Sequence, residues 1–337
     1  MKKSSILYIG NDLSEKSKYN STMETLSKLL ESDGMTIYKS SNKLNKLVRL
    51  LHMSFSVIKY RKKVDYILID TFSTVNFYYA FITSQLARIF NIKYISILHG
   101  GNLPIRLVNS KILSKMIFAN SFKNVAPSNY LKIAFEKKNY ETVFIPNILE
   151  IENYSYKERK NIRPNILWVR SFCHIYNPTM AIEVLYLVKK EFPKATLCMV
   201  GPVKDDSINL VKAKVKEYQL EKSVEFTGVL PKEKWHKKSV DYDIFINTTN
   251  FDNTPVSIME AMALGLIVVS TNAGGMPYLI DNDVDGILVD KENAKQMADQ
   301  ICNVLKKQHI RFTKRAREKA ETFGWEIVKD KWIKLLR

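Results

Sequence analysis

Short apolar runs recur along this chain at the intervals expected of a parallel β-sheet protein. Each run is followed by a longer amphipathic segment, which is typical of β-α units wound around a sheet. The runs are residues 5–11, 65–70, 93–99, 124–128 and 142–146 in the first half, and 165–170, 195–201, 224–228, 242–247, 266–270 and 286–290 in the second. The pattern predicts an α/β protein with two doubly wound parallel sheets.

Length and composition are consistent with two domains. A chain of 337 residues is long for one hydrophobic core, and 46% of its residues are hydrophobic. The three cysteines, Cys173, Cys198 and Cys302, are widely spaced, so neither a disulfide framework nor a zinc site is indicated. The N-terminus leads directly into a strand, and no stretch has the roughly 18 consecutive apolar residues of a membrane span. We expect a cytoplasmic protein that is not inserted in a bilayer.

The net charge of +18 is concentrated in the first half of the chain. Residues 1–150 contain 22 Lys and Arg against 10 Asp and Glu, whereas residues 151–337 contain 30 against 24. Eight basic residues and no acidic residue lie in the segment 39–63, interleaved with apolar side chains. This segment fits a helix resting on an anionic membrane surface, and it fits an ordinary amphipathic helix with a basic face equally well. No recognisable module or aromatic stacking pattern indicates nucleic-acid binding.

Residues 243–278 carry the strongest indication of function. They contain a buried strand, a polar loop, an apolar helical stretch, a second strand and a glycine pair. Thr254 as an N-cap, Pro255 as a first-turn residue and Gly265 as the terminating residue predict a helix over 255–264.

Two acidic residues lie close to this helix in the sequence. Glu260 is on the helix, and a buried carboxylate needs donors, either from an internal Lys or Arg or from a ligand rich in hydroxyl groups. Asp252 precedes the helix N-terminus, where free amides favour an anion such as phosphate. Hydroxyl groups and phosphate together describe a nucleotide sugar.

The spacing of these two acids resembles the E-x7-E motif of family 4 glycosyltransferases, also called glycosyl transferases group 1. Further segments that resemble this family are LHGG at 98–101, VAPSNYLKIAFEK at 125–137, VFIPN at 143–147, FPKATLCMVGP at 192–202 and VEFTGVLPKEK at 224–234. The resemblance covers almost the whole chain. It implies the GT-B fold, in which two Rossmann-like domains face each other across a cleft, and retention of the anomeric configuration of the donor sugar.

The resemblance also implies a division into domains. We expect residues 1–150 to form an N-terminal acceptor-binding domain and residues 151–322 to form a C-terminal domain that binds the nucleotide sugar. A C-terminal helix, 323–337, is expected to pack back on the first domain. The segment 150–163 is charged and lacks a hydrophobic period, so it is predicted to be the interdomain linker.

Three site residues follow from matching the family motifs. The resemblance implies that Glu260 binds the ribose hydroxyls. Asp252, standing where the family usually has Glu, is expected to contact the donor sugar near the reacting carbon. Arg170 ends a strand, where its guanidinium group can grip the diphosphate and neutralise the leaving group. The lysine that follows this arginine in the family is absent, and His174, Asn177 or a lysine from elsewhere is a candidate substitute.

The same resemblance places a histidine and several backbone groups at the donor. His99, at the end of an N-terminal strand, is expected near the donor sugar, so that the expected catalytic residues are His99, Asp252 and Arg170. Gly228 and Val229 are expected to lie along the nucleobase. Backbone donors to sugar and phosphate are expected from Asn253, Thr254 and Val256.

The loop after the first strand offers a further candidate. Ser21 and Glu24 fit a capping box, which leaves amides able to hold a phosphate of donor or acceptor. Capping alone explains the pattern equally well.

Two segments match metal-binding sequence motifs but lie in a structural context that does not fit them. Asp241 and Asp243 form a D-x-D sequence at the entry of a predicted strand, and residues 281–292 satisfy the calcium-loop pattern but lead into a strand where a helix is required. We expect no metal site and no cofactor.

These observations predict a retaining, hexosyltransferase-type glycosyltransferase. Its donor is expected to be a nucleotide diphosphate sugar, with a UDP-sugar expected ahead of a GDP-sugar. Its acceptor is expected to be a saccharide or a lipid-linked saccharide of a cell-surface polysaccharide or glycolipid. The location is expected to be cytoplasmic, with peripheral attachment to the inner membrane face as an option. Two alternatives stay open: a nucleotide-sugar hydrolase or epimerase on the same fold, and a catalytically silent partner that binds a sugar nucleotide.

Overall fold

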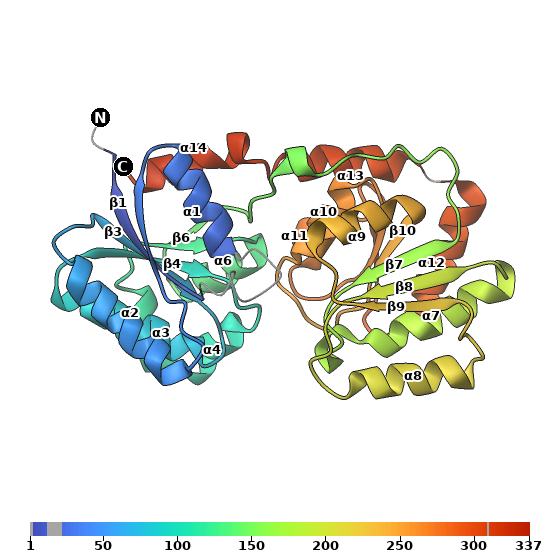
Figure 1. Cartoon of the computed structure of the whole chain (residues 1–337), viewed down its shortest axis with the longest axis horizontal. Coiled ribbons are helices and arrows are strands. Elements are labelled where there is room, and N and C mark those ends of the chain that lie inside the picture. Colours follow the sequence, from blue (N-terminus) through green and yellow to red (C-terminus); the bar gives the residue numbers. More distant parts are fainter. Residues whose placement is uncertain (1–2, 12–21, 309) are drawn as a thin grey trace. The chain divides into compact units, whose positions relative to one another are not determined.

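A computed structural model describes residues 3–11, 22–308 and 310–337. The chain forms two compact units, unit 1 comprising Met1–Ile148 together with Trp325–Arg337, and unit 2 comprising Leu149–Gly324 (Figure 1). These bounds lie within two residues of the expected domain division. The expected capping serine, Ser21, lies outside the described residues.

Unit 1 contains a parallel sheet of six strands in the order β2-β1-β3-β4-β5-β6. The strands are β1 Ser5–Ile9, β2 Thr36–Ser40, β3 Tyr66–Thr71, β4 Lys93–Leu98, β5 Lys123–Ala126 and β6 Thr142–Phe144. The apolar runs predicted all of them except β2. Among the described strands this edge strand pairs with β1 alone, and its partly exposed residues form no apolar run.

Two layers of helices cover the sheet of unit 1, because alternate residues of its strands point to opposite faces. On one face α1 (Thr22–Ser32) and α14 (Trp325–Leu335) pack against the sheet, so the C-terminal helix belongs to unit 1. The other face is covered by α2 (Lys46–Tyr60), α3 (Asn76–Ile89), α4 (Leu103–Asn109), α5 (Lys111–Phe118) and α6 (Asn129–Glu136).

Unit 2 contains a second parallel sheet of six strands, in the order β12-β11-β10-β7-β8-β9. The strands are β7 Asn165–Val169, β8 Thr196–Val200, β9 Val224–Gly228, β10 Ile244–Asn247, β11 Ile267–Thr271 and β12 Ile287–Val289. The predicted α/β fold with two doubly wound parallel sheets is therefore confirmed.

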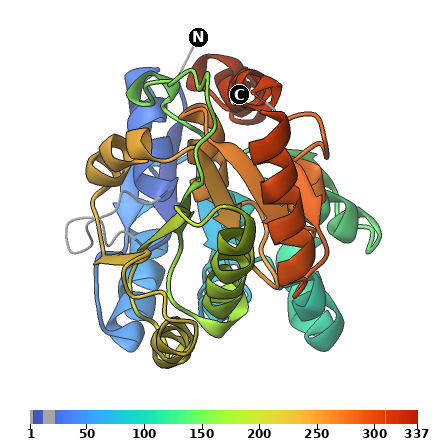
Figure 2. The same ribbon diagram turned by 90° about the vertical axis from the view of Figure 1, so that its right-hand side faces the viewer.

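Helices cover both faces of the unit 2 sheet as well. The adjacent helices α7 (Pro178–Glu191), α8 (Ser207–Glu217) and α12 (Ala294–Lys307) pack on one face (Figure 2). The other core is formed by α9 (Lys232–Lys238), α10 (Val256–Ala263), α11 (Met276–Leu279) and most of the apolar side of α13 (Arg311–Glu321). Short 3-10 turns occur at η2 (Ile151–Asn153), η3 (His174–Tyr176) and η4 (Ser239–Asp241).

The segment 150–163 is part of unit 2, so its prediction as a linker was wrong. Tyr154, Arg159 and Ile162 are buried, with 6%, 2% and 5% of their surface exposed. The segment lacks an apolar period because it crosses several elements and buries single side chains against each of them.

In the described part of the chain, none of the helices combines the length and the hydrophobicity that spanning a membrane requires.

Candidate active site

The sheet of unit 2 has its topological switch point between β7 and β10. From β7 the chain continues to β8 and β9 on one side, whereas β10, β11 and β12 lie on the other. Ligands of doubly wound sheets bind at the carboxyl ends of the strands at such a point. Arg170 directly follows β7, and Asp252 lies in the loop that follows β10. The two side chains form an ion pair, so the structure brings together two of the predicted catalytic residues.

Arg170 is held between an aromatic ring and a carboxylate. Its guanidinium carbon lies 4.3 Å from the centre of the Tyr176 ring. Burial lowers the pKa of Arg170, although this group stays cationic. Its Nε is buried and has no hydrogen-bond partner among the described residues. A side chain at Gly201 would place its Cβ 1.8 Å from the Arg170 carbonyl oxygen, which explains the glycine there.

The Asp252 loop is packed against the glycine pair that follows β11. The amide of Gly275 donates to the Asp252 carbonyl at 2.9 Å, and a Cβ at Gly274 would lie 2.0 Å from the same oxygen. The two glycines therefore allow a close backbone approach to this loop. Asp252 Oδ1 accepts the amide of Asn253 at 2.8 Å, so that this predicted donor is already used within the loop.

Helix α10 begins one residue later than predicted. Its N-cap is Pro255, and Thr254 does not cap it, because the chain enters the helix through an extended proline. The hydroxyl oxygens of Thr254 and Ser257 are buried without a hydrogen-bond partner in the described structure. Val256 occupies the first helical position, where an amide has no partner within the helix. Gly265 ends the helix as predicted, with a φ of 77°.

Glu260 is buried on α10, with 4% of its surface exposed. Its Oε1 accepts a hydrogen bond from the Tyr154 hydroxyl at 3.0 Å and lies 2.9 Å from Lys232 Nζ. Of the two kinds of partner that the sequence left open, an internal lysine is thus present. Burial raises the pKa of Glu260, and Lys232 opposes this by stabilising the charged form.

His236 completes the surroundings of Glu260. Its Nε2 lies 3.9 Å from Glu260 Oε1, and its ring centre lies 4.7 Å from that of Tyr154. Burial, followed by the nearby charge of Lys232, lowers the pKa of His236 to about 4. Tyr154, Lys232 and His236 were not predicted from the sequence. Lys232 and His236 are four residues apart on one face of α9, which was the signal available.

Unpartnered polar atoms are concentrated around these residues. In the described part of unit 2, buried side-chain atoms without a hydrogen-bond partner belong to Arg170, Ser207, His236, Asp252, Thr254 and Ser257. All except Ser207 lie on the elements just described, and Asp252 among them is ion-paired. Buried polar groups are nearly always satisfied, so such a concentration indicates a site that a polar ligand completes.

The predicted nucleobase loop lies at the end of β9, the edge strand that β8 separates from β7. Gly228 has a φ of 66°, which a glycine adopts without strain. No described atom lies within 4 Å of a Cβ built at Gly228, so this position is open. Val229 follows it and is half-buried.

The two candidate substitutes for the missing lysine are engaged elsewhere. His174 Nε2 lies 2.7 Å from Asp206 Oδ1, and the His174 amide donates to Asp205 at 2.9 Å. Within the described residues, the side chains of His174, Asp205 and Asp206 form the one group whose potential metal-ligand atoms lie close together. Each of the three already has a hydrogen-bond partner in the protein. Asn177 caps α7 with its side chain.

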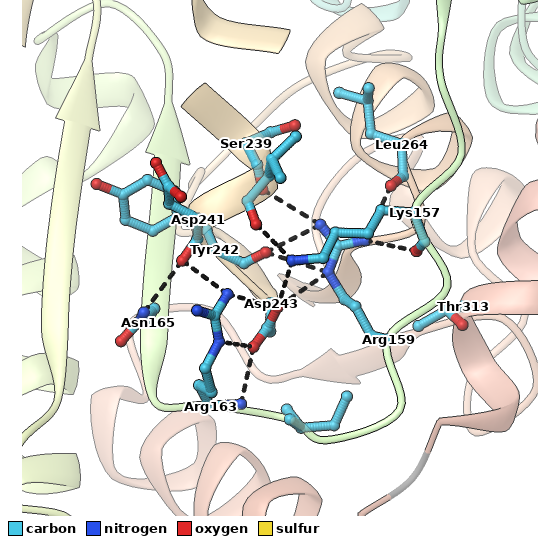
Figure 3. Close-up of polar contacts among 12 residues, drawn as sticks. Lys157, Arg159, Arg163, Asn165, Ser239, Asp241, Tyr242, Asp243, Leu264 and Thr313 are labelled. Atoms are coloured by element: carbon cyan, nitrogen blue, oxygen red, sulfur yellow. Dashed lines mark hydrogen bonds and ion pairs between the residues drawn. The ribbon is translucent and has the colours of Figure 1, made fainter. Parts of the chain in front are cut away.

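The D-x-D sequence is part of a buried salt-bridge cluster (Figure 3). Asp243, which has 1% of its surface exposed, pairs with Arg159 at 3.2 Å and with Arg163 at 2.8 Å. Asp241 contributes its backbone carbonyl, which accepts from Arg163 and Asn165. Two arginine side chains thus already pair with the carboxylate of Asp243.

Two acidic residues of the segment that matches the calcium-loop pattern pair with a lysine. Lys319 Nζ lies 2.8 Å from carboxylate oxygens of both Asp281 and Asp285. The following residues form β12, as predicted, and not a helix.

In unit 1, His99 lies at the end of β4 within a buried polar cluster. Its Nε2 lies 2.8 Å from Asp70 Oδ1, and the same oxygen accepts the Tyr8 hydroxyl at 3.0 Å. The Asp70 carboxylate thus lies within hydrogen-bond distance of both the imidazole of His99 and the phenol of Tyr8. Burial raises the pKa of Tyr8 well above its ordinary value. The sequence analysis missed Asp70, although an acid at the carboxyl end of an apolar run was a signal.

Comparisons with solved structures place both units in a known fold class. HepE of Anabaena, in complex with UDP and glucose, has a TM-score of 0.78 at 16% identity and is covered at 99% of both chains. Sucrose-phosphate synthase of Thermosynechococcus elongatus has a TM-score of 0.83 at 17% identity, over 99% of this chain and 98% of that one. At these identities the likeness concerns the fold, which is GT-B.

The family itself follows from the sequence of unit 2. The model described as glycosyl transferases group 1 matches residues 151–323, which is just over half of the chain. The protein belongs to this glycosyltransferase family.

Individual relatives match over parts of the chain. The putative colanic acid biosynthesis glycosyltransferase WcaL of Escherichia coli is 32% identical over 133 residues, which is 36% of this chain and 33% of that protein. The capsular polysaccharide biosynthesis glycosyltransferase CapH of Staphylococcus aureus is 25% identical over 218 residues, or 62% of this chain and 59% of that protein. The match to the first of these relatives thus spans about a third of its length.

Proposed function

We propose that this protein is a retaining glycosyltransferase, which moves a hexose-type sugar from a nucleotide diphosphate sugar to an acceptor hydroxyl. The observation that supports this most directly is the set of unpartnered polar atoms at the unit 2 switch point, around Arg170 and the first turn of α10. A diphosphate sugar carries the anionic and hydroxyl groups that these atoms lack. Family membership points to the same reaction.

The proposed reaction breaks the bond between the anomeric carbon and the diphosphate oxygen. Arg170 and the first amides of α10 neutralise the departing diphosphate. Asp252 stabilises the positive charge that develops at the sugar, and His99 binds the donor sugar. The acceptor oxygen then forms its bond on the same face, and its proton passes to a leaving phosphate oxygen. This chemistry needs no metal ion, so we expect activity to survive a chelator.

The substrates follow as further proposals. The solved structures of HepE contain UDP, UDP and glucose, or UDP-glucose, which supports a UDP-linked donor for this chain. Curated relatives are named for colanic acid, capsular polysaccharide and amylovoran biosynthesis, which supports a saccharide or lipid-linked acceptor of a cell-surface polymer. Such an acceptor is consistent with a cytoplasmic protein that contacts the inner membrane face through its basic segment 39–63.

Glu260 provides the first test of the donor site. We expect the wild-type protein to be stabilised selectively by one member of a panel of UDP-, GDP-, ADP- and CMP-sugars in a thermal-shift assay. Glu260→Gln removes the charge that binds ribose and should weaken the preferred nucleotide about 10- to 100-fold. It should also abolish the preference for UDP over 2′-deoxy-UDP.

Glu233→Gln is the matched control, because Glu233 is exposed on α9, the helix that carries Lys232. It should bind like the wild type. A Glu260→Gln protein that retained full affinity and ribose preference would contradict the assignment, and would mean that Lys232 and Tyr154 are the permanent partners of this carboxylate.

A silent nucleotide-binding partner is the alternative that the structure favours in one respect. Asp252 is paired with Arg170, and Glu260 with Lys232, so both acids have protein partners before any donor binds. Product analysis with the preferred donor separates the options. Transfer to added acceptor membranes supports the transferase, free sugar without acceptor supports a hydrolase, and binding without turnover supports the silent partner.

A further inference from the structure

The two faces of the unit 1 sheet differ in their acidic residues. The helices α1 and α14 on one face contain Glu24, Glu31, Glu326 and Asp330. On the other face, α2, α3, α4 and α5 contain no Asp or Glu at all. The fifth helix of this layer, α6, ends at Glu136, which pairs with Lys132 at 2.7 Å. The acid-free helices are thus sorted to one side of the sheet by the handedness of the β-α-β crossovers.

The same asymmetry extends through the surrounding chain. Between Asp33 and Glu136 the sequence has fifteen Lys and Arg and two acids, Asp65 and Asp70. Asp65 accepts the amide of Ser5 at 2.8 Å, and Asp70 is buried. Neither acid lies on the helices. The outer surface of α2–α5 therefore carries positive charge that no carboxylate of these helices balances.

This face also exposes large apolar side chains. Helix α2 turns Met53 and Val57 into the core, yet Leu47, Leu51 and Phe55, one turn apart, are 74%, 69% and 60% exposed. The other exposed apolar residues of this region are Leu44, Val48, Ile58, Val75, Tyr78, Ile89, Ile105, Val108 and Ile112. Within the described residues, the stretch from Leu44 to Ile112 holds twelve of the 24 exposed large hydrophobic side chains. Figure 1 shows α2, α3 and α4 along one side of unit 1.

Exposure of such an apolar surface to water is energetically unfavourable. Monomeric soluble proteins rarely expose large contiguous apolar patches, and those that exist usually bind something. Helices with basic residues beside exposed Leu, Ile and Phe are suited to the boundary between lipid headgroups and acyl chains. There the apolar side chains leave water while Lys and Arg stay at the level of the headgroup phosphates.

We propose that the outer face of α2, α3, α4 and α5 docks on an anionic lipid bilayer. Leu47, Leu51 and Phe55 enter the interfacial layer, and the exposed side chains Ile105, Val108 and Ile112 on α4 and α5 contribute to the same face. This deepens the proposed function, because it places a lipid-linked acceptor beside the enzyme. The docking itself rests on exposure and charge and not on the transfer chemistry.

Charge decides between lipid and the other occupants of such a surface. A symmetric contact with a second copy of the chain would bring two acid-free basic faces together, which is electrostatically unfavourable. A nucleic acid would satisfy the basic residues but would leave the Leu and Ile side chains in water, since its backbone offers no apolar surface to cover them.

Vesicle flotation tests the apolar contribution. We expect wild-type protein to float with vesicles of phosphatidylcholine mixed with phosphatidylglycerol, and only weakly with phosphatidylcholine alone. The double variant Leu51→Ser/Phe55→Ser should lower the partition coefficient about tenfold or more. The matched control Leu210→Ser/Ile327→Ser changes two side chains on α8 and α14 that are 52% and 55% exposed, and should leave it unchanged.

Charge variants test whether α5 belongs to the docking face. Lys111→Gln/Lys115→Gln should weaken binding to the anionic vesicles, with a shallower salt dependence. Lys314→Gln/Arg315→Gln removes two exposed cations from α13 of unit 2 and serves as the control.

Three results would overturn the proposal. One is wild-type protein that does not float with anionic vesicles, and another is equal losses in the test and control variants. The third is a wild-type dimer in light scattering that Leu51→Ser/Phe55→Ser makes monomeric, because the face would then be a contact between copies. UDP binding, measured by thermal shift without vesicles, reports separately on the proposed donor site, so a failure of either idea is distinguishable from a failure of the other.

Discussion

At the residue scale, Glu260 and His236 share one buried environment with opposite consequences. Burial disfavours the charged form of each, so it raises the pKa of Glu260 and lowers that of His236. The cation of Lys232 then favours the carboxylate and further disfavours the imidazolium. The site therefore combines a carboxyl group whose pKa is raised with a histidine whose pKa is lowered, and His236 accepts a proton only well below neutral pH.

The lowered pKa of His236 predicts a loss of stability in acid. The unfolded chain takes up a proton near the ordinary value of 6.5, whereas the folded protein resists until about 4. The contribution of neutral His236 to the unfolding free energy is therefore fully present above pH 6.5 and is lost as the pH falls toward 4. The loss amounts to about 3 kcal/mol. His236→Gln should flatten this part of the pH profile of the unfolding free energy, measured by calorimetry. His174→Gln is the control, because the pKa of His174 is raised by Asp206 and its contribution has the opposite sign. An unchanged profile for His236→Gln would contradict the assignment.

At the element scale, α10 is held in place from its C-terminus. Its last carbonyls belong to Ala263 and Leu264, which accept from Arg317 at 2.8 Å and from Arg159 at 2.9 Å. Arg317 also donates to the carbonyl of Tyr154 at 2.7 Å, so that one guanidinium aligns the helix that carries Glu260 with the segment that supplies its tyrosine partner. These contacts satisfy carbonyls that a helix end leaves free.

Arg159 and Arg163 allow a paired test of this anchoring. Both pair with Asp243, but the Arg159 side chain is 1% exposed and that of Arg163 is 48% exposed. Arg159→Met leaves Asp243 and several carbonyls with fewer donors in the interior, and should cost about 3 to 5 kcal/mol in unfolding free energy. Arg163→Met should cost about 1 kcal/mol or less, because water replaces its contacts. Denaturant titration measures both, and equal costs would show that burial of Arg159 does not decide its role.

At the scale of the whole molecule, the chain ends in the unit in which it began. After Gly324 the helix α14 and the residue that follows it pack on the unit 1 sheet through Val328, Trp332 and Leu336, which are 1%, 3% and 0% exposed. Ser4 donates to the carbonyl of Leu336 at 2.6 Å, and Trp325 donates to Asp33 at 3.1 Å. Unit 1 is therefore completed only by residues that follow the whole of unit 2.

This arrangement predicts a local effect of one distant substitution. Trp332→Ala should destabilise unit 1 by about 3 to 5 kcal/mol, because it leaves a cavity beside β1 and β3. Hydrogen exchange should then lose protection in the unit 1 sheet and retain it in β7, β8 and β10. Ile327→Ala, at a position that is 55% exposed on the same helix, should change little. Equal loss of protection in both sheets would contradict an independent unit 1 core.

Much of the fold could be predicted from the sequence, because parallel strands buried on both faces produce apolar runs. The runs that predicted β7 to β12 needed no tertiary information, and Gly265 marked the end of α10 correctly. The start of α10 was off by one residue, since a proline serves equally well as the last extended residue or the first helical one. Strand β2 was missed because an edge position does not require apolar side chains.

The site was predicted only in part, for a related reason. Arg170 and Asp252 stand at strand ends that the sequence could identify, and topology makes those ends neighbours. The partners of Glu260 come from residues 106 and 28 positions earlier in the chain, and no local pattern connects them. The distribution of charge along the chain could be taken from the sequence. The sequence did not show that the acid-free helices lie on one face of unit 1.

The sequence by itself determined the two parallel sheets, the short helix that carries Glu260 and the excess of positive charge in the first half. Only the tertiary structure decided that Arg159 is buried in a segment composed like a linker, that Lys232 and Tyr154 reach Glu260, and that α2 turns Leu47, Leu51 and Phe55 outward. The hydrophobic periodicity of a sequence indicates which side chains of one helix or strand are buried and which are exposed to water. Which group it meets depends on elements brought together from distant parts of the chain, and that information exists only in the folded protein.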